Sequence, residues 1–343
     1  MEKQKIKIAF FETEPWEREY LQAKLEKKLP KTAILKFFEK PLDNRKAEAI
    51  KDTEILAVFI YSNISREIVD KLPRLKFIAT MSTGFDHIDL AVCRKKGVKA
   101  SNVPYYGENT VAEHTFALIL ALSRKIPQSI ERTRKGNFTL ENLRGFDLKG
   151  KTIGIVGLGH IGKQAAKIAS GFGMKIIAYD VKKDLRTARK LKIKYVGLNR
   201  LLGKADIISL HAPYNQSTHH LISKNNIKNI KKGAYLINTA RGALVETEAL
   251  ILALKNNILA GAGLDVLEEE CFLKEEKALL TSPFRKKCDL RTVLQDHLLL
   301  HHPKVLITPH NAFNSQEALT RILDTTIKNI LGFVKRKPVN LII

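Results

Sequence analysis

Short apolar runs alternate with stretches of helical periodicity along the chain, and they fall into two successive series. Such runs, rich in Ile, Val, Leu and Phe, are typical of buried parallel strands joined by helices. The first series predicts strands over 6–11, 34–38, 55–61 and 77–80. The second series predicts strands over 153–156, 175–179, 207–210, 234–237, 260–265 and 305–308. The pattern therefore predicts the α/β class.

Helix signals lie between these strands. Ser65 is expected to cap a helix over 66–72, because its hydroxyl is suited to accept a hydrogen bond from the first turn. The long apolar-sided segment 109–123 predicts a helix that crosses from the first series to the second. The segment 315–328 predicts a helix that returns to the first series.

The two series define two domains. We expect doubly wound parallel sheets, Rossmann-like or flavodoxin-like, in a domain made of 1–107 and 309–343 and in a second domain over 108–308. The length fits, because 343 residues are enough for two domains of about 100–200 residues each. Since the chain crosses the boundary twice, we expect the functional site in the cleft between the domains.

A glycine-rich turn follows the first strand of the second series. Gly157, Gly159 and Gly162 stand at G-x-G-x-x-G spacing and lead into a helical pattern over 163–172. Such a turn places a helix N-terminus against a pyrophosphate. The next strand ends in Asp180, and a carboxylate there accepts hydrogen bonds from ribose hydroxyls and repels a 2′-phosphate. The sequence therefore predicts a dinucleotide site that prefers NAD to NADP.

Three later fragments supply an arginine, an acid and a histidine. Arg241 belongs to the run NTARG, Glu270 lies five residues after Asp265, and His310 ends the run TPH. An arginine pairs with a carboxylate through parallel hydrogen bonds and polarises an adjacent carbonyl. A histidine exchanges protons near neutral pH, and a nearby carboxylate favours its protonated form. These side chains meet the needs of hydride reduction of a 2-keto acid.

These motifs and three N-terminal runs resemble a known family. The runs are IKIAFFETEPWE (6–17), STGFDHID (82–89) and NVPYYGENTVAEH (102–114). Over nearly its whole length the chain resembles the D-isomer-specific 2-hydroxyacid dehydrogenases, and within that family most closely the fermentative D-lactate dehydrogenases. The resemblance implies reduction of a small 2-keto acid to the D-2-hydroxy acid with hydride from NADH. The expected 2-keto acid is pyruvate.

The resemblance also implies roles for individual residues. Arg241 is expected to bind the substrate carboxylate, and Glu270 to pair with His310, the general acid. The first domain is expected to bind substrate and the second to bind NAD. Further expected substrate contacts are Thr83, Gly84, Tyr106 and Phe313. Expected cofactor contacts are Gly157, Gly159, His160, Ile161, Gly162, Asp180, His211, Pro213, Thr239, Ala240 and Asp265.

Some positions depart from the family pattern and leave alternatives open. Met81 stands where related sequences often carry arginine, and Asn311 and Asn314 replace polar neighbours typical of D-lactate dehydrogenases. A bulkier 2-keto acid, hydroxypyruvate or glyoxylate is therefore the alternative substrate. An NAD-binding regulatory corepressor is the alternative from another functional class, although it has no need to keep the arginine, acid and histidine together.

The charge of the chain raises a further alternative. A formal net charge of +24 is compatible with nucleic-acid binding. The basic residues are scattered, however, and do not form a block interleaved with aromatic side chains. We therefore expect a solvated lysine-rich surface and no specific nucleic-acid partner.

Four smaller expectations complete the prediction. No apolar run approaches the ~20 residues needed to span a bilayer, so we expect a cytoplasmic protein without a membrane partner. The resemblance implies a homodimer, formed through 109–123 and the arm 136–148. The cysteines are expected to be reduced thiols and not disulfides: Cys93, Cys271 and Cys288. No metal site is expected at the clustered histidines, His297, His301 and His302.

Overall fold

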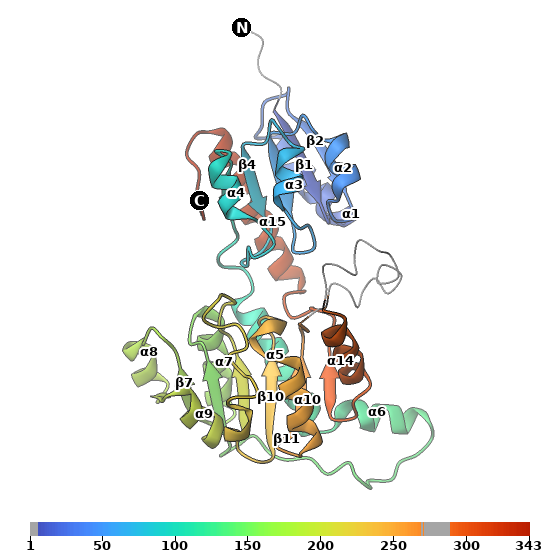
Figure 1. The fold of residues 1–343 in the computed structure, drawn as a ribbon, viewed down its shortest axis with the longest axis vertical. Helices are drawn as coiled ribbons and strands as arrows, with labels where there is room; N and C mark the ends of the chain where they lie inside the picture. Colours follow the sequence, from blue (N-terminus) through green and yellow to red (C-terminus); the bar gives the residue numbers. More distant parts are fainter. Residues whose placement is uncertain (1–5, 269, 271–288) are drawn as a thin grey trace. The chain divides into compact units, whose positions relative to one another are not determined.

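The computed structural model describes residues 6–268, 270 and 289–343. The chain divides into two compact units, one formed by Met1–Tyr106 with Ser315–Ile343 and the other by Gly107–Asn314 (Figure 1). Each unit is a parallel sheet covered by helices, which confirms the predicted α/β class. Because the second boundary lies at residue 315, His310 belongs to the same unit as Glu270.

The first unit contains a five-stranded parallel sheet with the order β2-β1-β3-β4-β5. This is the flavodoxin-like arrangement of a doubly wound sheet. Its strands are β1 (Lys7–Phe11), β2 (Ile34–Phe38), β3 (Ile55–Val58), β4 (Phe77–Thr80) and β5 (Lys99–Ser101). Its helices are α1 (Pro15–Glu26), α2 (Asn44–Ala49), α3 (Arg66–Asp70), α4 (Leu90–Lys95) and α15 (Gln316–Val334). Phe77 of β4 stacks on Phe333 of α15 with 4.4 Å between ring centroids, which joins the C-terminal helix to the sheet.

The second unit contains a seven-stranded parallel sheet with the order β12-β11-β10-β9-β6-β7-β8. The strands are β6 (Thr152–Val156), β7 (Lys175–Tyr179), β8 (Lys194–Tyr195), β9 (Ile207–Leu210), β10 (Ala234–Asn238), β11 (Leu259–Leu264) and β12 (Val305–Ile307). The strand order reverses between β6 and β9. In an open parallel sheet, ligands bind outside the carboxyl ends of the strands at this reversal, so the topology itself marks a ligand site.

Helices cover both faces of the second sheet. They are α5 (Glu108–Ser123), α6 (Ile126–Arg134), α7 (His160–Gly171), α8 (Leu185–Lys190), α9 (Leu198–Lys204), α10 (Thr247–Lys255) and α14 (Leu290–Leu300). Two apolar clusters fill the interior. One packs α5 and α7 on the sheet, and the other packs α9 and α10. Because both faces are buried, the strands consist of continuous apolar residues instead of an alternating pattern.

The predicted elements are confirmed in place, with differences at their ends. The strand predicted over 55–61 ends at Val58, because the backbone N–H groups of Phe59 and Tyr61 donate to the Glu12 carboxylate instead of extending the ladder. Ser65 is the N-cap residue of α3, as predicted, but its side chain makes no capping hydrogen bond, and the helix ends at Asp70 instead of residue 72. Two short strands, β5 and β8, were not predicted.

Candidate active site

The glycine-rich turn lies between β6 and the N-terminus of α7. Gly157 has a φ of 92°, and a Cβ there would come within 2.7 Å of the His211 and Ala212 backbone. A Cβ on Gly162 would lie 2.1 Å from the Gly157 oxygen, so the turn requires glycine at both positions. A Cβ on Gly159 would have no neighbour within 4 Å, which leaves this backbone open to a ligand. An open backbone before a helix N-terminus fits the pyrophosphate of NAD.

Asp180 follows β7 and is held beside this turn. Its Oδ2 accepts a hydrogen bond from the Leu158 N–H at 2.6 Å, and its Oδ1 accepts one from the Lys182 N–H at 2.8 Å. These bonds fix the carboxylate next to the glycine backbone. A carboxylate in this position suits the ribose hydroxyls of NAD and disfavours an added phosphate.

His160 and Ile161 form the first turn of α7, where backbone N–H groups lack partners within the helix. The His160 imidazole has a partner of its own, since its Nδ1 lies 3.0 Å from Oε1 of Glu108 at the start of α5. The predicted role of both residues as cofactor contacts therefore depends on their backbone N–H groups.

Four more predicted cofactor contacts lie on the loops that follow β9 and β10. His211 Nε2 shares a hydrogen bond with Ser209 Oγ at 2.8 Å, and burial lowers the pKa of the imidazole to about 4. His211 is therefore uncharged at neutral pH. Pro213 lies two residues further along the same loop. Thr239 Oγ1 shares a hydrogen bond with Thr115 of α5, and Ala240 donates its N–H to the Asn238 side chain.

The buried carboxylate of Asp265 holds the loop that contains His310. Its carboxylate accepts hydrogen bonds from the Thr308 hydroxyl and from the N–H groups of Asn311, at 2.7 Å, and Ala312, at 2.8 Å. Burial alone would raise the pKa of Asp265, but the hydrogen bonds from His114, Thr308 and the two N–H groups outweigh it and lower the pKa. The ionised carboxylate thus fixes the loop on both sides of His310.

His310 is oriented by both its backbone and its side chain. Its φ of 52° is in the left-handed region, and its N–H donates to the Asp265 carbonyl oxygen at 2.8 Å. Its Nδ1 lies 2.7 Å from Glu270 Oε1, with both side chains mostly buried. The Phe313 ring meets the imidazole edge-to-face at 6.4 Å between centroids. A histidine whose Nδ1 is held by a carboxylate has its other nitrogen, Nε2, available for proton transfer.

Arg241 follows β10 on a loop that packs against the segment before Glu270. A Cβ on Gly242 would lie 2.1 Å from the Leu267 backbone, so only glycine permits this close packing. The Arg241 Nη1 donates to the Ala240 carbonyl oxygen at 2.8 Å. Its backbone oxygen accepts a hydrogen bond from Asn238 Nδ2 at 2.8 Å. The guanidinium therefore extends from a loop with a fixed backbone.

The contacts of Glu268 were not predicted from the sequence. Its carboxylate is mostly buried and forms an ion pair with His220 Nε2. It also accepts hydrogen bonds from the Thr247 hydroxyl at 2.8 Å and the Thr247 N–H at 3.2 Å. It thus joins the first residue of α10, the segment after β9 and the segment before Glu270. The three adjacent glutamates 268–270 were visible in the sequence, but no pattern distinguishes one that holds a loop from one that holds a histidine.

Three further predicted substrate contacts lie in the first unit. The Thr83 hydroxyl donates to the Val103 oxygen at 2.7 Å, and the Gly84 oxygen accepts from the Ser82 hydroxyl at 2.6 Å. The Tyr106 backbone oxygen accepts a hydrogen bond from Arg321 Nε at 2.6 Å. The bonds of Thr83 and Gly84 fix the turn after β4, and the bond from Arg321 fixes the backbone at Tyr106. Met81, which departs from the family pattern, is buried at the end of this strand.

The chain is similar in sequence and fold to known proteins. The family model "D-isomer specific 2-hydroxyacid dehydrogenase, NAD binding domain" matches residues 116–312. D-lactate dehydrogenase of Escherichia coli is 34% identical over 96% of this chain and 97% of its own length. Glyoxylate reductase of Thermococcus litoralis is 35% identical over 86% of this chain and 85% of its own length. D-lactate dehydrogenase from Aquifex aeolicus, solved with NAD and lactic acid, is 36% identical with a TM-score of 0.84 over 96% of both chains.

The chain belongs to the D-isomer-specific 2-hydroxyacid dehydrogenase family. It is an NAD-dependent oxidoreductase that reduces 2-keto acids to D-2-hydroxy acids. The predicted family, cofactor and enzyme class are thus confirmed, and the corepressor alternative is wrong. When bound, NADH would supply the hydride, and the residues that would hold it are Gly157, Gly159, Gly162 and Asp180.

Other expectations concern cysteines, membranes and metals. Cys93 is a buried free thiol whose pKa burial raises to about 11, while Cys271 and Cys288 lie outside the described residues. No helix in the described part of the chain has the length and apolar character required to cross a bilayer. Within 6–268, 270 and 289–343, no three His, Cys, Asp or Glu side chains are grouped to hold a metal ion.

The position of Asp180 predicts the choice between the two nicotinamide cofactors. We expect kcat/KM with NADH to exceed that with NADPH by at least about tenfold, or ~1.4 kcal/mol, because the fixed carboxylate repels a 2′-phosphate. Steady-state rates with each cofactor at saturating keto acid measure this ratio. Equal use of both cofactors would show that Asp180 does not face the ribose.

Proposed function

We propose that this enzyme reduces pyruvate to D-lactate, with His310 as the general acid and Arg241 as the residue that binds the substrate carboxylate. The observation that supports this most is the 2.7 Å contact between His310 Nδ1 and Glu270 Oε1. A carboxylate at this distance orients the imidazole through Nδ1 and leaves Nε2 to donate the proton. The similarity to two D-lactate dehydrogenases supports pyruvate as the substrate.

Arg241, His310 and Glu270 have different chemical tasks in the proposed reaction. The guanidinium of Arg241 pairs with the substrate carboxylate and polarises the adjacent carbonyl. As C2 is reduced, the carbonyl oxygen becomes an alkoxide and takes the proton from Nε2 of His310. Glu270 holds Nδ1 and balances the imidazolium charge. For the backbone of Thr83 and Gly84 we propose a further contact with the carboxylate, and for Tyr106 and Phe313 contact with the substrate.

Glyoxylate is the second candidate substrate. It is favoured by the similarity to glyoxylate reductase, whose identity to this chain matches that of the D-lactate dehydrogenases. The two keto acids differ by one methyl group, and a single methyl in an apolar pocket changes selectivity by only about 10- to 200-fold.

A panel of 2-keto acids tests the proposal. We expect kcat/KM, followed by NADH absorbance, to be highest for pyruvate among pyruvate, glyoxylate, hydroxypyruvate and 2-ketoisocaproate. A higher kcat/KM for glyoxylate or for 2-ketoisocaproate would show that pyruvate is not the preferred substrate. The reaction class would be unchanged.

Substituting Glu270 by Gln tests whether the carboxylate supports the acid. Glutamine keeps an oxygen beside Nδ1 of His310 but replaces the charge-assisted contact of 2.7 Å with a neutral one. We expect kcat for keto-acid reduction to fall by about tenfold or more, the equivalent of one hydrogen bond between charged groups at ~1.5–3 kcal/mol. Initial-rate kinetics at saturating NADH and keto acid measure this fall. A kcat within a few-fold of the wild-type value would show that Glu270 does not support His310 in the reaction.

We also propose a homodimer formed through α5 and the arm 136–148. The arm exposes large apolar side chains, with Phe138 at 77% and Leu140 at 82%, and exposed apolar patches mark interaction surfaces. Light scattering of the full chain at micromolar concentration is expected to give the mass of a dimer. Replacing Phe138 and Leu140 by Ser is expected to shift it toward the monomer, whereas a wild-type monomer would contradict the proposal.

A further inference from the structure

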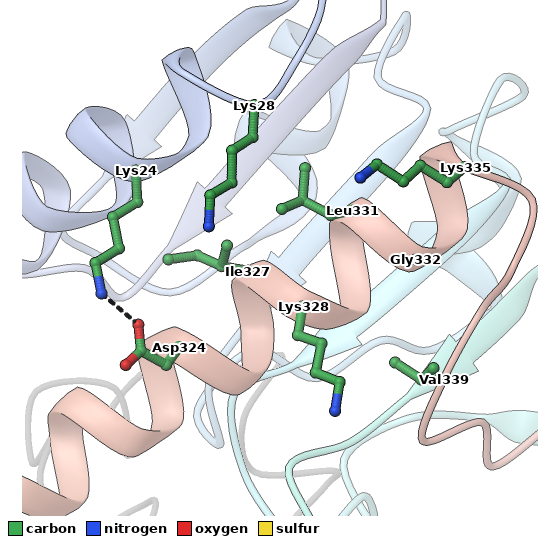
Figure 2. Close-up of a pocket in the computed structure, with 9 residues that line it drawn as sticks. All are labelled: Lys24, Lys28, Asp324, Ile327, Lys328, Leu331, Gly332, Lys335 and Val339. Carbon is green, nitrogen blue, oxygen red and sulfur yellow. Dashed lines mark hydrogen bonds and ion pairs between the residues drawn. The ribbon is translucent and has the colours of Figure 1, made fainter.

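A cavity lies in the first unit, between α1 and α15. Its volume is about 440 Å³, within the range of ~300–1,000 Å³ typical of small-molecule sites. None of the residues assigned above to the cofactor or the keto acid lines it. The lining residues are Lys24, Lys28, Asp324, Ile327, Lys328, Leu331, Gly332, Lys335 and Val339 (Figure 2).

The charged lining of this cavity is predominantly basic. Four lysines and one aspartate line it, for a formal charge of +3 (four minus one). Lys24 Nζ pairs with Asp324 Oδ1 at 2.7 Å, and this bond raises the pKa of Lys24 (Figure 2). In the part of the chain that the structure describes, Lys28, Lys328 and Lys335 form no ion pair with a carboxylate. Three ammonium groups around one concave surface favour a ligand with several negative charges.

The rest of the lining is apolar. Ile327 is buried at 4% exposure, and Leu331 follows one helical turn later on the same face of α15. Val339 adds a second wall, because the chain turns back after α15. Gly332 permits this return, since a Cβ there would lie 2.8 Å from the Lys337 oxygen. The ligand that fits such a lining therefore has an apolar body as well as charged groups.

We propose that this cavity binds an amphipathic polyanion, the diphosphate ester of a short apolar alcohol or a close chemical equivalent. The apolar body lies on Ile327, Leu331 and Val339, and the diphosphate meets the ammonium groups of Lys28, Lys328 and Lys335. Because the lining carries a formal charge of +3, a diphosphate matches it better than a single carboxylate does. The recessed position of Ile327 favours a small molecule over a membrane surface.

The test uses geranyl diphosphate as the probe and the full-length enzyme saturated with NAD, so that the pyrophosphate site at α7 is filled. Isothermal titration is expected to show binding of about one equivalent. Inorganic pyrophosphate, which lacks the apolar body, and geraniol, which lacks the charge, are each expected to bind at least about tenfold more weakly. The double variant Lys28→Gln/Lys328→Gln is expected to weaken binding of the probe by at least about tenfold.

The matched control is Lys40→Gln/Lys51→Gln, which removes the same charge from exposed lysines of the same unit that do not line the cavity. This control is expected to bind the probe as the wild type does. Equal weakening in both double variants would show that net charge alone attracts the probe and would overturn the proposal. Absence of probe binding, or tighter binding of pyrophosphate than of geranyl diphosphate, would overturn it as well. The enzyme could fail to bind the probe and instead sediment with phosphatidylglycerol vesicles in a way that requires Lys28. That result would overturn the proposal and show that the cavity residues bind a lipid surface.

Discussion

Replacing His310 by Gln is expected to lower kcat for keto-acid reduction by roughly 10²- to 10⁴-fold, the usual contribution of a general acid. Glutamine keeps a polar side chain but has no proton to give at the developing alkoxide. The Asp265 contacts to the loop involve backbone groups and the Thr308 hydroxyl, so the loop is expected to keep its conformation. NADH affinity is therefore expected to change little, and stopped-flow single turnover separates this chemical effect from cofactor binding.

A matched control for this variant is His297→Gln on α14, outside the candidate site. It is expected to retain wild-type kinetics. If His310→Gln kept kcat within a few-fold of wild type, another residue would donate the proton and the assignment would be wrong. A fall in kcat with a large fall in NADH affinity would instead show that the loop had collapsed.

Arg241→Lys is expected to lower kcat/KM for the keto acid by roughly 10- to 150-fold, the equivalent of one hydrogen bond between charged groups at ~1.5–3 kcal/mol. Lysine keeps the positive charge but loses the planar fork that pairs with a carboxylate and polarises its neighbour carbonyl. Both effects act on the substrate, so KM is expected to rise and kcat to fall, with NADH affinity unchanged. Initial-rate kinetics over a range of keto-acid concentrations give both values.

The control for this variant is Arg200→Lys, an exposed position on α9. Unaltered keto-acid kinetics in Arg241→Lys would show that a different cation holds the carboxylate. A change confined to NADH affinity would place Arg241 at the cofactor instead.

The fold was largely predictable because its strands are buried on both faces. Runs such as 153–156 and 207–210 contain almost no polar residue, and the G-x-G-x-x-G turn fixed where the second sheet begins. The ends of elements were less predictable, since they depend on partners distant in sequence. Glu12 ends β3 from 47 residues away, and nothing near Val58 in the sequence indicates it.

The sequence predicted the candidate residues whose side-chain type and motif indicate a chemical role. It did not predict the residues that hold other residues in position. Arg241, Glu270 and His310 stood out by type and motif. The anchoring of the His310 loop by Asp265 and the bridging contacts of Glu268 span 46 and 48 residues along the chain. Such contacts depend on which strands become neighbours, because β11 brings Asp265 and Glu268 beside the loops after β12 and β10. The acidic residues are visible in the sequence, but the residues that they contact are not.

The configuration of the product tests the central claim most directly. The wild-type enzyme is incubated with NADH and pyruvate to completion, and the lactate is assayed with stereospecific reagents for each enantiomer. We expect D-lactate, formed in one equivalent per NADH oxidised. L-lactate as the product, or no oxidation of NADH with pyruvate, would contradict it.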